Sequence, residues 1–400
     1  MAKKPVIKKD EKSYLATECD KVGEIAVQYG FTVIKPPHIQ PADVTKTKPF
    51  KEFDYYTDAD EKVALTEWYV RENLQGQAQP LMVHYKKPLH GSGIKKKTTE
   101  EMYGFEIMGS GRSTSEALCL KTALAILSDY GYKDIYVDIN SIGDKESIVK
   151  FEREMASYYR KNNHLMPAKT KNEFKKNPYM TLVKSVAEME AFSCGAPQTI
   201  GSLSDLGRIH FKEVLEYLEA FDIAYKIKPN LFANKTYAAH TVFEIRHMTG
   251  KGEESVLLAY GYRYNYLAKK IGHKKEIPCI GLTVVIKKQP ALAKKIIIKN
   301  IKKPKFYLVQ LGSTAKLKAL NVVEILRKNK IPVYHSMTKD KITGQLTGAE
   351  YMHATHVLII GQKEANENTI VVRDINTRAQ ETVPVNGIVE YLKKIDKSGK

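Results

Sequence analysis

The chain lacks the patterns that mark several large classes of protein. No stretch of its 400 residues approaches the ~20 consecutive apolar residues that a membrane-spanning helix needs. The lysine-rich residues 1–14 lead into no apolar stretch, so we expect no secretory signal. Its four cysteines are scattered without a CxxC pair, which predicts reduced thiols, a cytoplasmic location and no metal site. The chain also has no P-loop, no GxGxxG segment and no ordered Ser-His-Asp or Cys-His pattern.

What the chain has in excess is positive charge. Its 64 Lys and Arg outnumber 45 Asp and Glu, which gives a formal net charge of +19. Such a surplus favours an anionic partner, most often nucleic acid, because each phosphate contact releases counterions. A lysine surface that only keeps the protein soluble is the alternative, but here the lysines are clustered. A hydrophobic content of 43% is typical of a globular chain, and the length allows two or three domains.

The spacing of apolar residues predicts a first part in which helices pack on an antiparallel sheet, the α+β class. Apolar residues at helical spacing predict helices over Glu11–Gln28, Ser115–Tyr130 and His210–Phe221. Segments rich in β-branched and aromatic residues predict strands at Thr241–Arg246, Ser255–Tyr260 and Pro278–Val285. The polar stretch that begins near Asn162 has neither pattern and predicts an insertion over about 162–200.

A change of pattern divides the chain near residue 290. Eight lysines in residues 287–305, with prolines near both ends, predict a basic linker at 291–304. Strands alternate with helices beyond it, which predicts a small α/β domain over 305–400. Residues 1–290 would then form the larger domain. His353 and His356 flank a predicted strand, and we interpret both as structural.

Several segments resemble one enzyme family in both order and spacing. Residues 230–245 keep Tyr237 and a Thr-Val-Phe-Glu strand at 241–244. Three further segments begin at Tyr29, Tyr136 and His210, and residues 308–385 are similar to an anticodon-binding domain. On these residues the chain resembles the class II histidyl-tRNA synthetase family. The resemblance implies a class II synthetase-like antiparallel sheet with flanking helices, a C-terminal α/β domain of the anticodon-binding type, and a homodimer.

The positions that this family uses for chemistry agree less well. The arginines that the family places at the α-phosphate and the adenine of ATP fall, on this resemblance, at His84, Ala233 and Lys288. Adenylate formation brings two anionic groups together, and losing one fixed donor typically costs about 10²–10³ in rate. A lysine lacks the planar guanidinium, and a histidine is mostly neutral near pH 7. We therefore assign no catalytic residue and expect impaired histidine activation.

Other positions of the family's pocket are kept. The candidates for ligand contacts are Glu67, Glu106, Glu116, Tyr237, Arg263 and Tyr264. Tyr262 and Tyr266 stand where the family has small residues that give room to a ligand. The run of tyrosines at 260, 262, 264 and 266 could stack bases, but such runs more often fill a cavity that no longer takes a ligand.

Two lysine clusters are candidate RNA contacts. The first lies in the loop that typically meets the tRNA acceptor end in class II synthetases: Lys86, Lys87, Lys95, Lys96 and Lys97. The second lies at the domain junction: Lys294, Lys295, Lys299, Lys302 and Lys303. For both clusters the alternative is a solvated surface without a partner.

The leading hypothesis is a divergent paralogue that binds tRNA or another structured RNA, and we assign no cofactor to it. The first alternative is an active ligase that joins histidine to tRNA, which would use ATP and Mg²⁺. The second alternative is a regulatory subunit of another enzyme, like the synthetase-like subunit of histidine biosynthesis. That subunit usually lacks the anticodon-binding domain, so the C-terminal residues of this chain speak against it.

Overall fold

A computed structural model of the chain describes residues 14–51, 54–76, 79–87, 99–165, 168–176, 195–248, 255–298, 304–337 and 339–398. Its larger sheet has eight strands in the order β2-β3-β4-β9-β8-β7-β5-β6. The edge pairs β2·β3 and β5·β6 are parallel, and the other neighbours are antiparallel. The strands are β2 (Thr32–Val33), β3 (Leu81–Lys86), β4 (Glu100–Met108), β5 (Ile135–Ser141), β6 (Tyr225–Ile227), β7 (Ala239–Met248), β8 (Ser255–Arg263) and β9 (Cys279–Lys287).

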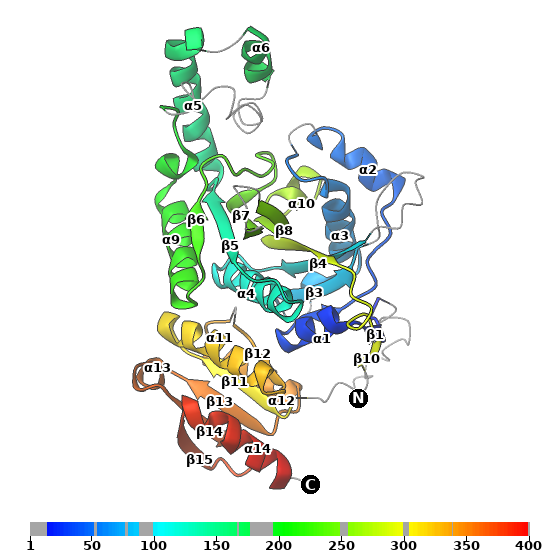
Figure 1. The fold of residues 1–400 in the computed structure, drawn as a ribbon, viewed down its shortest axis with the longest axis vertical. Helices are drawn as coiled ribbons and strands as arrows, with labels where there is room; N and C mark the ends of the chain where they lie inside the picture. The colour runs from blue at the N-terminus through cyan, green and yellow to red at the C-terminus, as the bar shows by residue number, and fades with distance from the viewer. Residues whose placement is uncertain are drawn as a thin grey trace, which may run out of the picture.

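Helices cover both faces of this sheet (Figure 1). One face packs against α1 (Lys21–Gln28), α4 (Thr114–Asp129) and α9 (Asp205–Ala220), whose apolar residues share a core with Phe105 and Ile139. The other face packs against α2 (Pro41–Thr47), α3 (Ala59–Arg71) and α10 (Leu267–Lys270). Short 3₁₀ turns lie at η2 (Leu74–Gly76), η3 (Asn163–Leu165), η4 (Thr199–Ser202) and η6 (Val385–Gly387). The candidate site lies on the face under α3.

The smaller sheet has five strands in the order β12-β11-β13-β14-β15. β11 pairs in parallel with β12 and β13, whereas β13·β14 and β14·β15 are antiparallel. The strands are β11 (Phe306–Gln310), β12 (Val333–His335), β13 (His356–Ile360), β14 (Thr369–Asp374) and β15 (Gln380–Pro384). Its helices are α11 (Ser313–Lys328), α12 (Ile342–Tyr351), α13 (Gln362–Glu367) and α14 (Ile388–Ser398).

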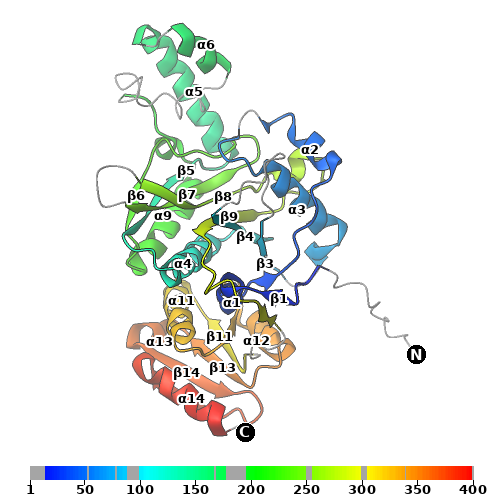
Figure 2. The same ribbon diagram turned by 45° about the vertical axis from the view of Figure 1, so that its right-hand side comes forward.

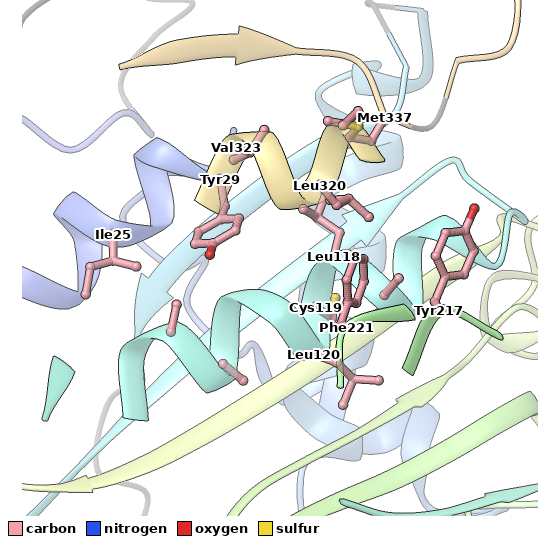
Figure 3. Close-up of a cluster of buried hydrophobic side chains, with 14 of the residues drawn as sticks. Ile25, Tyr29, Leu118, Cys119, Leu120, Tyr217, Phe221, Leu320, Val323 and Met337 are labelled. Carbon is pink, nitrogen blue, oxygen red and sulfur yellow. The ribbon is translucent and has the colours of Figure 1, made fainter. Parts of the chain in front are cut away.

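The two sheets are joined through one continuous hydrophobic core. Figure 3 shows Tyr29, the C-cap of α1, and Leu118 of α4 beside Leu320 and Val323 of α11, and all four are buried in the same cluster. The hydroxyl of Tyr29 also donates a hydrogen bond to the carboxylate of Glu324 on α11. Because core packing and the Tyr29–Glu324 hydrogen bond cross the junction, the C-terminal sheet is held against the larger one.

The α+β prediction is confirmed, with two differences in the elements. The predicted helix over Glu11–Gln28 begins only at Lys21, because Asp20 caps it by accepting a hydrogen bond from the amide of Gly23 at 3.1 Å. The preceding β1 (Glu18–Cys19) pairs instead with β10 (Ile296–Ile297), inside the predicted linker.

The predicted insertion is described only in part. α5 (Lys145–Asn162) continues into it, and α6 (Ala168–Lys176) lies within it; both stand at the end farthest from the smaller sheet (Figures 1 and 2). Residues 177–194 lie outside the described residues, and the division at 290 and 305 stays a prediction. In the described part of the chain, no helix has the length and apolar character needed to cross a bilayer.

Candidate functional site

The candidate site is built around Glu106 on the sheet face beneath α3. Side chains alternate between the faces of a strand, so Glu106 shares its face with Gly104 and, across the β3·β4 pair, with Tyr85. On the next strand Gly281 lies opposite Glu106, and a Cβ there would overlap the ammonium of Lys62 and the Glu106 carboxylate. Because Gly281 has no side chain, the Lys62 ammonium has room against the sheet.

Lys62 of α3 forms a buried ion pair with Glu106. The two side chains are 1% and 0% exposed, and the carboxylate of Asp58 lies 3.9 Å from the Lys62 ammonium. Tyr264 donates a hydrogen bond to Glu106 Oε2 at 2.7 Å. Burial alone would lower the pKa of Lys62, but Glu106, Asp58 and Glu61 outweigh it and raise this pKa well above its usual range. Lys62 is therefore held as a cation that these carboxylates already neutralise.

Tyrosines close the space around this ion pair. Tyr56 stacks on Tyr260 with ring centroids 4.2 Å apart, and Tyr262 donates to Asp58 Oδ1 at 2.6 Å. Tyr237 donates to Asp54 Oδ1 at 2.9 Å. We call these residues together the tyrosine–carboxylate cluster: Asp54, Tyr56, Asp58, Glu61, Lys62, Tyr85, Glu106, Tyr237, Glu244, Tyr260, Tyr262 and Tyr264. Its six tyrosines are each no more than 9% exposed, so the chain itself fills this face of the sheet.

Three of the six predicted ligand-contact residues lie in this cluster, and three do not. Tyr264 donates to Glu106, and Tyr237 donates to Asp54 of the same cluster. Arg263 and Glu116 instead form a separate buried pair, with the guanidinium of Arg263 also donating to the carbonyls of Ser110 at 2.8 Å and of Arg112 at 2.6 Å. This pairing joins β8 to the start of α4 and marks Arg263 as a structural residue.

Glu67 is the third exception. It lies on α3 with its side chain 21% exposed and pairs with Lys46 and His273. It lines a separate cavity of about 350 Å³ together with Tyr14, Lys35 and Trp68. Glu67 therefore lies outside the cluster around Glu106, and its contact with a ligand stays a prediction.

The three positions that lack the family's arginines also lie apart. His84 is buried on the opposite face of the sheet from Glu106, where its ring lies 4.3 Å from that of Phe105. Burial lowers the pKa of His84 to about 4, so the ring is neutral and packs as an aromatic side chain. Ala233 is buried in the same hydrophobic cluster as Tyr237, and Lys288 is exposed beyond the end of β9. His84 thus cannot stand in for an arginine at a phosphate on the Glu106 face.

The structure describes four of the ten lysines that are predicted to contact RNA. Lys86 is half exposed and paired with Glu101, whereas Lys87 is buried and its ammonium lies 3.0 Å from Glu61 of the tyrosine–carboxylate cluster. Lys294 is exposed, and the exposed Lys295 pairs with Glu18 at 2.8 Å. Lys95, Lys96, Lys97, Lys299, Lys302 and Lys303 lie outside the described residues. The assignment of Lys87 to an RNA surface does not fit its burial.

Sequence reasoning missed the acidic side of the cluster. Asp54, Asp58, Glu61 and Lys62 come from one tyrosine-rich stretch that leads into α3. Asp58 and Lys62 are four residues apart, a spacing that places both on one side of a helix start. That spacing beside a pair of tyrosines was the signal available in the sequence. Among the described residues, no group of three or more His, Cys, Asp or Glu side chains is arranged to hold a metal ion.

Comparisons with known proteins agree on the fold. A family model for "Anticodon binding domain" matches residues 305–395. The chain is 28% identical over 339 residues to a histidine–tRNA ligase of Halothermothrix orenii, covering 82% of this chain and 78% of that protein. It is 25% identical over 397 residues to the histidine–tRNA ligase of Fervidobacterium nodosum, covering 93% and 92%. The apo histidyl-tRNA synthetase structure from S. aureus superposes with a TM-score of 0.53 at 21% identity, covering 93% of each chain.

Proposed function

The chain belongs to the class II histidyl-tRNA synthetase family, and from that premise we propose that it binds tRNA or another structured RNA without activating histidine at synthetase rates. In this proposal it acts as a cytoplasmic homodimer. The net charge of +19 supports an RNA partner, because phosphate contacts by lysine release counterions. The match of residues 305–395 to an anticodon-binding domain supports the same class of partner.

The observation that carries the proposal is the filled, acidic sheet face. The two lysines at the cluster, Lys62 and Lys87, are already paired with Glu106 and Glu61. An incoming triphosphate would have to displace these carboxylates and the tyrosines that pack beside them. It would then meet the buried carboxyl of Asp58, and the arginine that adjoins this cluster, Arg246, is already paired with Glu244. Adenylate formation needs preorganised positive charge at the α-phosphate, and this face does not fit that requirement.

Histidine-dependent exchange of pyrophosphate into ATP tests the loss of activation. We expect no exchange above the rate without histidine, with Mg²⁺ present throughout and an intact histidyl-tRNA synthetase as the positive control. Exchange at the rate of that control would overturn the proposal.

RNA binding needs its own measurement. We expect the affinity for tRNA to fall with added salt, with a log–log slope that reflects several phosphate contacts. A slope near zero would contradict binding through lysines, whatever the exchange assay shows.

An active ligase is the second candidate, because Glu106, Tyr237 and Tyr264 belong to one cluster, in which the ring of Tyr262 lies between those of Tyr237 and Tyr264. That function would need ATP and Mg²⁺, and the tyrosine–carboxylate cluster would have to open to admit them. The exchange assay separates this candidate from the first. A regulatory subunit is the third, and the match of residues 305–395 to an anticodon-binding domain disfavours it, because such subunits usually lack that domain.

A further inference from the structure

A cavity of about 420 Å³ lies at the junction of the two sheets. None of its lining residues belongs to the tyrosine–carboxylate cluster. Its walls come from the start of α4, from α9 and from the start of α11. Its size falls at the lower end of the roughly 300–1,000 Å³ range that is typical of small-molecule sites. None of the sequence motifs discussed above assigns a role to it.

The topology of the smaller sheet places this cavity where open α/β sheets bind ligands. β11 lies between β12 and β13, and all three strands are parallel. The chain leaves β11 through α11 to reach β12 on one side, and returns through α12 to β13 on the other. The carboxyl end of β11 is therefore a topological switch point. Gly312 and Ser313, which line the cavity, follow this strand end directly.

The N-terminus of α11 opens on the cavity. Gly312 is its N-cap with a φ of 97°, and no side chain caps the helix. The amide donors of the first turn and the helix dipole favour an anion at such an end. Lys316, in the first turn, adds a full positive charge to the same wall.

Two cations from different parts of the chain meet on one carboxylate here. The guanidinium of Arg112 lies 2.8 Å from Asp340 Oδ2, and the ammonium of Lys316 pairs with Oδ1 of the same side chain. Burial opposes ionisation of Asp340, but Lys316 and Arg112 outweigh it and hold the pKa of this carboxyl below its usual range. Asp340 thus occupies a place where an anion is stabilised, and its side chain is 43% exposed.

The opposite wall offers hydrogen-bond acceptors and one unpaired hydroxyl. Thr114 lines the cavity with its Oγ1 buried, and within the described ranges this atom has no hydrogen-bond partner. Glu213 and Glu216 of α9 also line the cavity, and Glu213 already accepts a hydrogen bond from the Ser113 hydroxyl. Such a wall suits the hydroxyl or amine donors of a ligand, whereas the α11 wall suits its negative charge.

We propose that the junction cavity binds a nucleoside monophosphate, with the phosphate at the N-terminus of α11 between Arg112 and Lys316. The phosphate takes the place of the Asp340 carboxylate, and the sugar hydroxyls meet Thr114 and the α9 carboxylates. Because both sheets line the cavity, the bound ligand stabilises their junction. This site is separate from the lysine clusters proposed for RNA.

Calorimetric titration of the full chain with AMP, adenosine and inorganic phosphate tests the proposal. We expect AMP to bind, adenosine to bind at least about tenfold more weakly, and inorganic phosphate to compete with AMP, because hydrogen bonds between charged groups are stronger than neutral ones. Lys316→Met should weaken AMP binding about tenfold or more. Lys318→Met removes the same charge from the same helix outside the cavity wall, and it should leave AMP binding unchanged.

The variant Asp340→Asn distinguishes a ligand-binding site from an ion-pair network that only stabilises the fold. It removes the carboxylate that competes with the phosphate, so we expect tighter AMP binding and an AMP-dependent rise in the unfolding temperature that exceeds that of the wild type. Weaker AMP binding by this variant would overturn the proposal, as would equal affinities for AMP and adenosine. Absence of AMP binding by both the wild type and Asp340→Asn would overturn it too.

Discussion

Lys62 and Glu106 form an ion pair from which water is excluded, with side chains 1% and 0% exposed. The pair lies at the centre of the sheet face where the family resemblance implies a ligand pocket. Taking two charges out of water is costly, so such a pair contributes little net stability over apolar residues of the same size. Removing one partner is different, because it leaves the other as an uncompensated buried charge.

This asymmetry predicts the behaviour of single and double substitutions. Lys62→Met should lower the free energy of unfolding by about 3–5 kcal/mol, whereas Lys62→Met combined with Glu106→Leu should recover most of that loss. Urea denaturation measures both. Lys46→Met is the matched control, because its partly exposed pair with Glu67 contributes at most about 1 kcal/mol. A double variant as unstable as the sum of the single variants would contradict the pairing.

The Arg263–Glu116 pair predicts acid sensitivity of the fold. Burial opposes the charged form of Glu116, but Arg263 and His210 outweigh it and lower its pKa to about 2. A carboxyl with a depressed folded-state pKa contributes stability above its unfolded pKa of 4.5, and this contribution is lost as pH falls toward 2. We expect a loss of about 3 kcal/mol over that window, measured by urea denaturation at several pH values.

Glu116→Gln supplies the comparison for this acid sensitivity. It should be less stable than the wild type at pH 7, because Arg263 then remains buried without its counter-charge. Its stability should also fall less steeply with acid below pH 4.5. Parallel pH profiles for the two proteins would show that Glu116 is not the titrating group.

His84 predicts a pH dependence in a different window. Its pKa is about 4 in the folded chain because of burial, against an ordinary 6.5. As pH falls from 6.5 to 4, the unfolded chain takes up the proton first, so stability is lost by up to about 3 kcal/mol.

His84→Phe should flatten this part of the profile. The new ring keeps the packing on Phe105 but loses the hydrogen bond between His84 Nδ1 and the Gly104 carbonyl, so we expect a cost of about 1 kcal/mol at pH 8. An unchanged slope between pH 6.5 and 4 would contradict the assignment.

The sequence predicts the strands of this fold better than its site. β7 contains the predicted strand at 241–246, because alternating β-branched and aromatic residues report local burial directly. The sheet face that a side chain occupies is predicted wrongly where the prediction depends on matching a family motif. Adjacent residues of a strand point to opposite faces of the sheet. Matching the family's arginine to His84 instead of Tyr85 therefore assigns its role to the face opposite Glu106.

The same reasoning explains Glu67 and Lys62. They are five residues apart on α3, which places them about 140° apart around the helix, so only one of them can face the sheet. The pairing of Lys62 with Glu106 also joins residues 44 apart in sequence. Local patterns carry no information on such a contact, since it depends on how α3 crosses β4.

Lys87 and the three lysines at 95–97 are predicted to have opposite effects on RNA binding and on stability. Lys87 is buried against Glu61, so Lys87→Met should destabilise the fold by several kcal/mol and leave the salt dependence of RNA binding unchanged. Replacing Lys95, Lys96 and Lys97 together by methionine should instead lower the log–log salt slope by about 2–3 with little change in stability. Filter binding to tRNA at several salt concentrations and urea denaturation measure the two effects. If Lys87→Met lowers the slope as the triple variant does, Lys87 contacts RNA and its pairing with Glu61 opens on binding.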